Sequence, residues 1–248
     1  MKNIAHRGFS GKYPENTKIA FARAIELGAD MIELDVTLSK DKIPVVIHDD
    51  TLERTSNGRG KVRNVPLDKL KQFDFGSWMN PKFSEERIPT LEEVLQMIKK
   101  SKLGLNIEIK SSAFEKNFSD SCIESQTLKL INKYKLFNRI VISSFEPKIL
   151  LRLRELSPKV KLAYLIEPGY EKLKLDPIYF VNQVKAVSLN MHKSQIKSEI
   201  FHRAKERNIP VCVYTVNTMG ELKRMNKLEL AGVFTNYPDR LKKMTERK

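Results

Sequence analysis

Two short apolar segments each carry a pair of charged residues two positions apart. Glu33 and Asp35 lie in the first segment, and Glu108 and Lys110 lie in the second. Alternate residues of a β-strand point to one face, so each pair should share a face. Buried charges are costly unless they are paired or bound to a metal. Three converging carboxylates suit a hard cation, Mg²⁺ or Ca²⁺, and the alternative is a set of structural salt bridges to Lys110 and Arg7.

Two of the four histidines, His6 and His48, are expected at strand ends beside acidic residues. An imidazole changes charge near neutral pH and is suited to general acid/base catalysis. The other two lack such neighbours. We expect His192 to be structural and His202 to lie on a helix surface, which leaves His6 and His48 as the candidate catalytic pair.

Other side chains could complete a site for a phosphorylated substrate. Arg7 and Lys110 supply positive charge, and an arginine can bind phosphate through two hydrogen bonds. Glu15 lies in Pro14-Glu15-Asn16-Thr17, where Asn16 or Thr17 can cap a helix, so Glu15 belongs either to that helix start or to the site. Tyr214 ends another apolar segment and forms either a wall of the site or part of the core.

These residues are positioned by alternating strand-like and helix-like segments, a pattern typical of an α/β fold with a parallel sheet. The expected strands are Asn3–His6, Met31–Val36, Val45–His48, Leu105–Ile109, Ile140–Ser143, Leu162–Ile166, Ala186–Leu189, Val211–Val216 and Val233–Thr235. The expected helices are Thr17–Leu27, Leu91–Lys100, Asp120–Tyr134, Pro147–Leu156, Ser194–Glu206 and Met219–Lys227.

One of the nine expected strands cannot belong to a (β/α)8 barrel, which has eight. Only residues 37–44 separate the second strand from the third. Parallel neighbours need a crossover of about a dozen residues or more, so the third strand should instead form an antiparallel hairpin folded near Lys40-Asp41. This hairpin places His48 within one residue of the position opposite Glu33. The sequence therefore predicts a TIM (β/α)8 barrel with a β-hairpin after its second strand.

The segment Asp50–Pro89 interrupts the alternation and contains only one short helical piece, at Leu67–Phe73. We interpret it as a small insertion at the C-terminal rim of the barrel, serving as a lid or substrate wall. Residues 1–248 are then expected to form a single barrel domain.

The composition limits the class of protein. With 41% hydrophobic and 30% charged residues, the 248-residue chain is typical of a globular protein. Its net charge of +15 favours anionic partners, but the basic residues are spread along the chain. Neither a secretory signal nor an integral membrane segment is evident, and the isolated Cys122 and Cys212 are typical of a cytoplasmic protein. The sequence also lacks glycine-rich nucleotide motifs.

The ordered set of motifs resembles the glycerophosphodiester phosphodiesterase family across residues 4 to 239. The motifs are His6-Arg7-Gly8, Pro14-Glu15-Asn16-Thr17, Glu33-Leu34-Asp35-Val36, Val45-Val46-Ile47-His48-Asp49, Leu52-Glu53-Arg54-Thr55, Ile88-Pro89-Thr90-Leu91-Glu92-Glu93, Asn106-Ile107-Glu108-Ile109-Lys110, Ser143-Ser144-Phe145, Tyr214-Thr215-Val216-Asn217 and Thr235-Asn236-Tyr237-Pro238-Asp239.

The resemblance implies metal-dependent hydrolysis of glycerophosphodiesters to sn-glycerol 3-phosphate and an alcohol. It implies a Ca²⁺ or Mg²⁺ ion held by Glu33, Asp35 and Glu108, and acid/base catalysis by two histidines. Two positions depart from the family pattern. The hairpin turn has Asp41-Lys42 where the family usually has Asp-Gly, and Tyr214 stands where the family often has Trp.

Three other functions are compatible with parts of the sequence. A lysophospholipase D-like phosphodiesterase would use a similar barrel on lipid substrates. The basic charge suggests a nucleic-acid-binding protein, but no binding motif supports it and no nucleic-acid partner is expected. A barrel that has lost catalysis conflicts with the presence of all the expected metal and acid/base residues. The expected partner is a small-molecule glycerophosphodiester, and the oligomeric state stays open.

Overall fold

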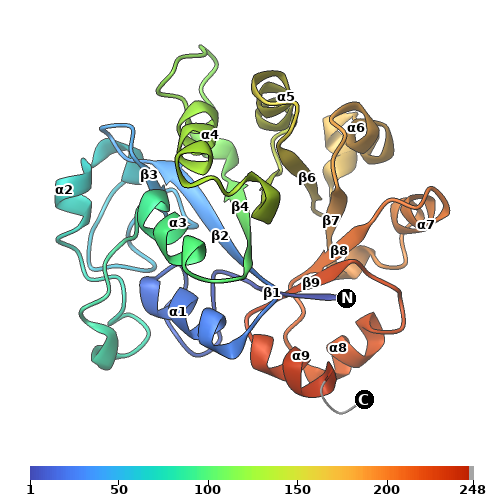
Figure 1. Cartoon of the computed structure of the whole chain (residues 1–248), viewed down its shortest axis with the longest axis horizontal. Coiled ribbons are helices and arrows are strands. Elements are labelled where there is room, and N and C mark those ends of the chain that lie inside the picture. The colour runs from blue at the N-terminus through green and yellow to red at the C-terminus, as the bar shows by residue number, and fades with distance from the viewer. Residues whose placement is uncertain (246–248) are drawn as a thin grey trace.

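Eight parallel strands form a closed barrel in the computed structural model, which describes residues 1–245 except the side chains of residues 172, 173 and 245. The first strand pairs with both its sequence neighbour and the last strand, which closes the ring. Helices surround the strands (Figure 1). The predicted TIM barrel is confirmed. Its strands are β1 (Lys2–Ala5), β2 (Met31–Leu38), β4 (Gly104–Ile109), β5 (Ile140–Ser144), β6 (Lys161–Ile166), β7 (Ser188–His192), β8 (Val211–Tyr214) and β9 (Gly232–Thr235).

Alternation along β2 separates the hydrophobic core from the interior of the barrel. Ile32, Leu34 and Val36 are fully buried in the main core, which lies between the strands and the surrounding helices. Glu33 and Asp35 point to the opposite face, as the period of two requires. The neighbouring strand β4 repeats the pattern, so carboxylates from both strands meet inside the barrel.

The expected hairpin is present as β3 (Pro44–Val46), which pairs antiparallel with the end of β2. The strand is shorter than predicted, because after Val46 the chain keeps a single ladder hydrogen bond, from Ile47 N to Asp35 O at 3.1 Å. His48 therefore lies in the following loop. In the turn, Lys42 takes φ of 61°, the left-handed conformation that a glycine adopts at lower cost.

Most predicted helices are present with small changes at their ends. They are α1 (Lys18–Leu27), α3 (Leu91–Lys99), α4 (Ile123–Tyr134), α5 (Pro147–Leu156), α7 (Glu199–Glu206) and α8 (Met219–Met225). The prediction of a helix over Ser194–Glu206 is wrong for its first residues, because α7 begins only at Glu199. Residues Lys193–Gln195 form a separate 3₁₀ turn, in which Gln195 bonds back to the backbone N–H of His192 at 3.1 Å. Two further helices, α6 (Pro177–Gln183) and α9 (Pro238–Thr245), were not predicted.

The insertion after the hairpin packs around a small apolar cluster of its own. Leu52, Leu70 and Ile88 are fully buried there, against Val45 and Ile47 from the hairpin. Its regular helix is the short α2 (Leu67–Leu70), which lies beside β3 in Figure 1. The hairpin thus joins the insertion to the barrel and sets the path of the chain near His48.

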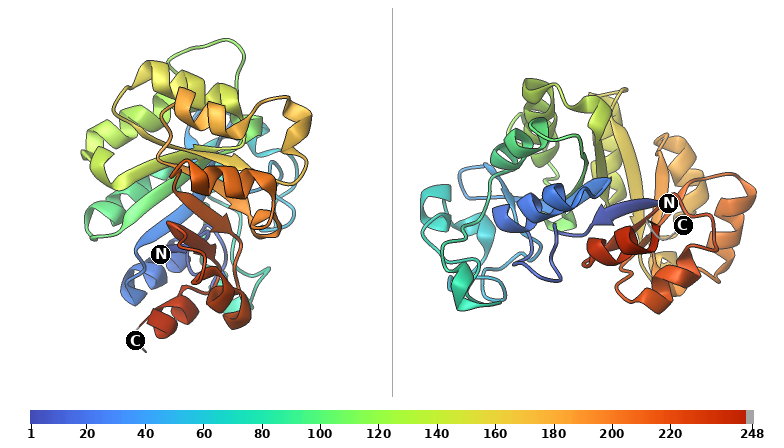
Figure 2. Two further views of the ribbon diagram at one scale, coloured as in Figure 1. Left: turned by 90° about the vertical axis from the view of Figure 1, so that its right-hand side faces the viewer. Right: turned by 60° about the horizontal axis from the view of Figure 1, so that its bottom comes forward.

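The first and last helices of the described chain lie side by side on the outside of the barrel. Both views in Figure 2 place α9 beside α1, and Lys242 Nζ donates to the carbonyl of Leu27 at 2.6 Å. Within residues 1–245, none of the helices combines the length and apolar character needed to cross a membrane.

Candidate active site

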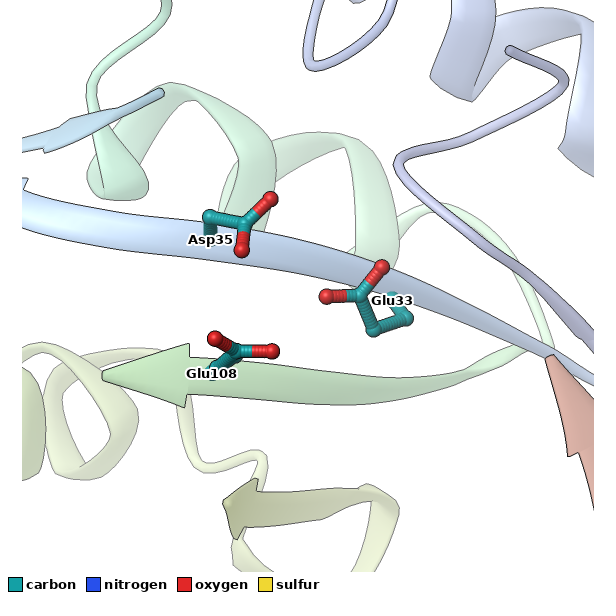
Figure 3. A group of neighbouring side chains, drawn as sticks. All are labelled: Glu33, Asp35 and Glu108. Atoms are coloured by element: carbon teal, nitrogen blue, oxygen red, sulfur yellow. The ribbon is translucent and has the colours of Figure 1, made fainter. Parts of the chain in front are cut away.

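Three carboxylates converge toward the carboxyl ends of β2 and β4. The parallel register sets Asp35 beside Glu108, and Glu33 precedes Asp35 by two residues on the same face. One oxygen from each residue lies within 4.8 Å of the others (Figure 3). Glu33 and Asp35 are 2% and 1% exposed. The structure therefore brings together the three residues that the sequence suggested as metal ligands.

Two cations offset part of this negative charge. Arg7 Nε lies 3.3 Å from Asp35 Oδ2. Lys110 Nζ lies 2.9 Å from Glu108 Oε1 and 3.6 Å from Asp35 Oδ1. Burial, reinforced by Asp35 and Glu108, raises the pKa of Glu33 well above its ordinary value. The salt bridges of the alternative interpretation are present, but among the described residues they join Arg7 and Lys110 to Asp35 and Glu108 and not to Glu33.

One buried oxygen of Glu33 has the properties of a metal ligand. Its Oε2 accepts a hydrogen bond from the backbone N–H of Arg7 at 2.8 Å. Its Oε1 is buried and has no hydrogen-bond partner among the described residues. An unpartnered buried acceptor costs about 1–3 kcal/mol. A hard divalent cation would supply the partner, and carboxylate oxygens are the ligands that Mg²⁺ and Ca²⁺ prefer.

The two histidines reach one cavity from different elements. His6 directly follows β1, and its Nδ1 lies 2.7 Å from Oδ1 of Asn236. His48 lies in the loop after β3, and its Nδ1 lies 2.6 Å from Oδ1 of Asp49. An ionised carboxylate only accepts hydrogen bonds, so the His48 proton lies on Nδ1 and Nε2 is left free. Both rings line a cavity of about 470 Å³.

Burial also decides the charge of the imidazoles. It lowers the pKa of His6 from 6.5 to about 4, and the positive charge of Arg7 adds to this effect. Burial likewise lowers the pKa of His48, although the negative charge of Asp35 opposes the shift. At neutral pH His6 is therefore an uncharged imidazole that can accept a proton.

A sharp turn after β1 aims Arg7 into the site. Arg7 takes φ of 55° and Gly8 takes φ of 80°. A Cβ on Gly8 would lie 2.8 Å from the backbone carbon of Ala20, so only glycine fits. Arg7 Nε is buried and has no hydrogen-bond partner among residues 1–245. The turn thus holds the guanidinium group of Arg7 beside Asp35 and at the edge of the cavity.

The segment before α1 supplies two contacts to these residues. Thr17 caps the helix and accepts from the backbone of its first turn at 3.4 Å. Asn16 instead donates to Asp35 Oδ2 at 2.9 Å. Glu15 Oε1 accepts from Arg7 Nη1 at 2.8 Å. Sequence reasoning considered Asn16 only as a helix cap and therefore missed its contact with the carboxylate cluster.

Tyr214 lies between the cavity and neighbouring aromatic side chains. Its ring lines the cavity and lies edge-on to Phe145, with 6.0 Å between ring centroids. Its hydroxyl donates to the carbonyl of Ile166 at 2.7 Å, which fixes the wall in place. His192, which we expected to be structural, lines the same cavity. His202 is exposed on α7, as expected.

Three residues that touch the site were given no role by the sequence. Asn236 and Asp49 bond to the two histidines. Arg54 bonds to both Asp49 and Glu15. Each lies within a motif quoted above, and Asp49 directly follows His48, but residue order alone does not tell which side chains meet.

Comparisons with known proteins identify the family of this chain. The sequence profile of the glycerophosphoryl diester phosphodiesterase family matches residues 6–240. A glycerophosphodiester phosphodiesterase of Caldanaerobacter subterraneus subsp. tengcongensis is 38% identical over 96% of this chain and 95% of its own length. A putative glycerophosphodiester phosphodiesterase of Bacillus subtilis is 36% identical over 96% of each chain.

A solved structure extends the comparison to a bound product. The phosphodiesterase of Oleispira antarctica, in complex with the product sn-glycerol-3-phosphate, superimposes with a TM-score of 0.86. The two proteins are 29% identical, and the match covers 98% of this chain and 96% of the other.

Proposed function

Because this chain belongs to the glycerophosphoryl diester phosphodiesterase family and is an enzyme that hydrolyses glycerophosphodiesters, we propose that it does so with a divalent metal and two histidines. The products are sn-glycerol 3-phosphate and an alcohol. The observation that carries the proposal is a single cavity in which two imidazoles face a carboxylate cluster with an unpartnered buried oxygen.

The proposed metal ligands are Glu33, Asp35 and Glu108, and the proposed ion is Ca²⁺ or Mg²⁺. Burial and two neighbouring carboxylates disfavour the ionised form of Glu33, and its Oε1 has no hydrogen-bond partner among the described residues; both observations support this assignment. When bound, such an ion supplies electrostatic stabilisation of the charge that grows on the phosphate oxygens. Arg7 and Lys110 bind and orient the phosphate from the same side. Tyr214 forms a wall of the cavity.

The hydrogen-bond partners of the histidines suggest different roles for the two rings. His6 is held by the neutral amide of Asn236 and has a lowered pKa, which favours the unprotonated ring that a general base needs. His48 is held by the carboxylate of Asp49, which stabilises a protonated ring. We assign His6 as the base that deprotonates the nucleophile. We assign His48 as the acid in its doubly protonated form, in which Nδ1–H stays bonded to Asp49 and Nε2–H is given to the leaving oxygen.

Single substitutions of the histidines test the proposal. His6→Ala and His48→Ala should each lower kcat on glycerophosphocholine by about 10²–10⁴-fold, the usual contribution of a positioned acid or base. His202→Ala is the matched control and should retain wild-type kcat, because His202 is exposed on α7. Near-normal turnover in either site variant would remove that histidine from the mechanism.

A second cavity keeps the lipid-cleaving alternative open to test. It has a volume of about 780 Å³ and shares Ser111, Phe145, Leu165 and Glu167 with the first cavity. Tyr170 and Leu175 extend its apolar lining. This space favours a bulky alcohol or an acyl chain as a secondary substrate. Comparing kcat/KM for glycerophosphocholine and lysophosphatidylcholine decides which class the enzyme prefers.

A further inference from the structure

Arg54, in the insertion, binds two carboxylates with one guanidinium group. Its Nη1 and Nη2 donate to the two oxygens of Glu15 at 2.9 and 2.8 Å. Its Nε and Nη2 donate to the two oxygens of Asp49 at 2.5 and 3.0 Å. Paired bonds of this kind fix orientation as well as distance, because the guanidinium group is planar. Arg54 therefore sets the position of Asp49 relative to Glu15.

Each of these carboxylates holds one residue of the candidate site. Asp49 Oδ1 accepts from His48 Nδ1 at 2.6 Å. Glu15 Oε1 accepts from Arg7 Nη1 at 2.8 Å. A continuous hydrogen-bond chain therefore runs from His48 through Asp49, Arg54 and Glu15 to Arg7. Its two ends line the catalytic cavity, whereas Arg54 does not.

We call the hydrogen-bond chain through Asp49, Arg54 and Glu15 the brace. The position of His48 depends on this brace more than the position of His6 does. The backbone N–H of His6 donates to the carbonyl of Thr235 at 3.0 Å, so the barrel holds this residue directly. His48 comes after the end of β3, in a loop, and its side chain is 32% exposed. Its ring nitrogen bonds to Asp49, and that carboxylate is fixed by Arg54. The position of the second imidazole thus rests on a side-chain network.

We infer that Arg54 is a positioning residue, which holds His48 and Arg7 at a fixed separation across the substrate phosphate. The inference rests on the proposed two-histidine function. It gives the insertion a part in the reaction that is independent of any lid or wall, because the brace acts through hydrogen bonds to Asp49 and Glu15. The motif Leu52-Glu53-Arg54-Thr55 acquires a physical role in this way.

Steady-state kinetics on glycerophosphocholine test this role. Arg54→Ala should lower kcat by about 10–100-fold, the cost of misplacing a catalytic group by about 1 Å, with KM changed less than about threefold. Arg54→Lys should recover only part of the loss, because an ammonium group cannot bind both carboxylates in one plane. Arg59→Ala is the matched control, since Arg59 is an exposed arginine of the same insertion.

Two further measurements separate positioning from simple stabilisation of the fold. Added guanidinium ion should partly restore kcat in Arg54→Ala, because the Arg54 side chain is 44% exposed and solvent can deliver the ion to its position. The same addition should leave kcat of Arg59→Ala unchanged. The ¹⁵N resonance of His48 Nδ1 should shift in Arg54→Ala, while that of His6 stays in place. The resonance reports on the brace whether or not turnover is measured.

The outcomes distinguish this inference from the proposed function. Wild-type protein without glycerophosphodiesterase activity removes the function itself. Active wild-type protein with Arg54→Ala within threefold of its kcat overturns the inference alone. A rise in KM with unchanged kcat also overturns it, because Arg54 would then bind the substrate directly. An unchanged His48 resonance in the variant contradicts the brace.

Discussion

Neutralising Glu33 should affect stability in opposite directions with and without metal. In Glu33→Gln the side chain keeps an oxygen that can accept from the backbone of Arg7 but loses its charge. Burial and the two neighbouring carboxylates raise the pKa of Glu33 above 4.5. The folded chain therefore holds this proton more tightly than the unfolded chain, and ionisation above about pH 4.5 weakens the native state.

The spacing of the carboxylates sets the size of the effect. Two unit charges 4.8 Å apart interact by about 3.5 kcal/mol at an effective dielectric constant of about 20. Arg7 and Lys110 offset much of this repulsion. We expect neutralising Glu33 to stabilise the metal-free protein by about 1–2 kcal/mol, which raises Tm by roughly 2–8 °C for a chain of this length.

Thermal unfolding with chelator and with metal measures both effects. In chelator at pH 7, Glu33→Gln should unfold at higher temperature than wild type. With Ca²⁺ or Mg²⁺ at about 100 times Kd, wild type should gain about 2.7 kcal/mol and the variant much less, so their order reverses. Well below pH 4.5 the difference in chelator should disappear, because the wild-type carboxyl is then protonated in both the folded and the unfolded states.

The control is Glu85→Gln, which changes an exposed carboxylate in the insertion. It should shift neither the Tm in chelator nor the Tm with added metal. Two results would refute the reasoning. A metal-free Glu33→Gln protein less stable than wild type would mean that the salt bridges already balance the cluster. A variant with the full metal-dependent rise in Tm would remove Glu33 from the set of ligands.

Three other substitutions follow from the geometry. Gly8→Ala should destabilise the fold by about 1–3 kcal/mol, because its Cβ would meet the backbone of Ala20 at 2.8 Å; an unchanged urea midpoint contradicts this. Asn236→Asp places a negative charge beside His6 and should raise the pKa of His6. The acid limb of the pH profile of kcat/KM should then move to higher pH. An acid limb at the wild-type pH argues against His6 as the base. Lys110→Met should raise KM and lower kcat together, and unaffected kinetics would show that Lys110 serves only as a structural ion pair.

The barrel could be predicted from the sequence because its strands are short apolar runs with clear boundaries. The eight residues between Val36 and Val45 are too few for a parallel crossover. This length alone predicted that the third strand forms a hairpin and is not one of the eight barrel strands. Two helices were missed because their signals are weak. Pro177–Gln183 spans only two turns, and Pro238–Thr245 begins inside the motif Thr235-Asn236-Tyr237-Pro238-Asp239.

The inner part of the site was also accessible to sequence reasoning. The period of two placed Glu33 and Asp35 on one face, and the strand order then brought Glu108 beside them. The hydrogen-bond network of Arg54, Asp49 and Glu15 could not be predicted from the sequence, because it depends on side-chain contacts between distant loops. Arg54 meets Glu15 across 39 positions of sequence, and neither hydrophobic pattern nor spacing encodes that meeting.

The most direct test of the proposed function is the metal dependence of product formation. Chelator-stripped protein is incubated with glycerophosphocholine, and sn-glycerol 3-phosphate and choline are quantified as Ca²⁺ or Mg²⁺ is titrated back. We predict turnover at the blank level in the stripped protein and a saturable rise to equal amounts of both products with at least one of the two ions. Full turnover in the stripped protein, or release of phosphocholine and glycerol, would contradict the proposal.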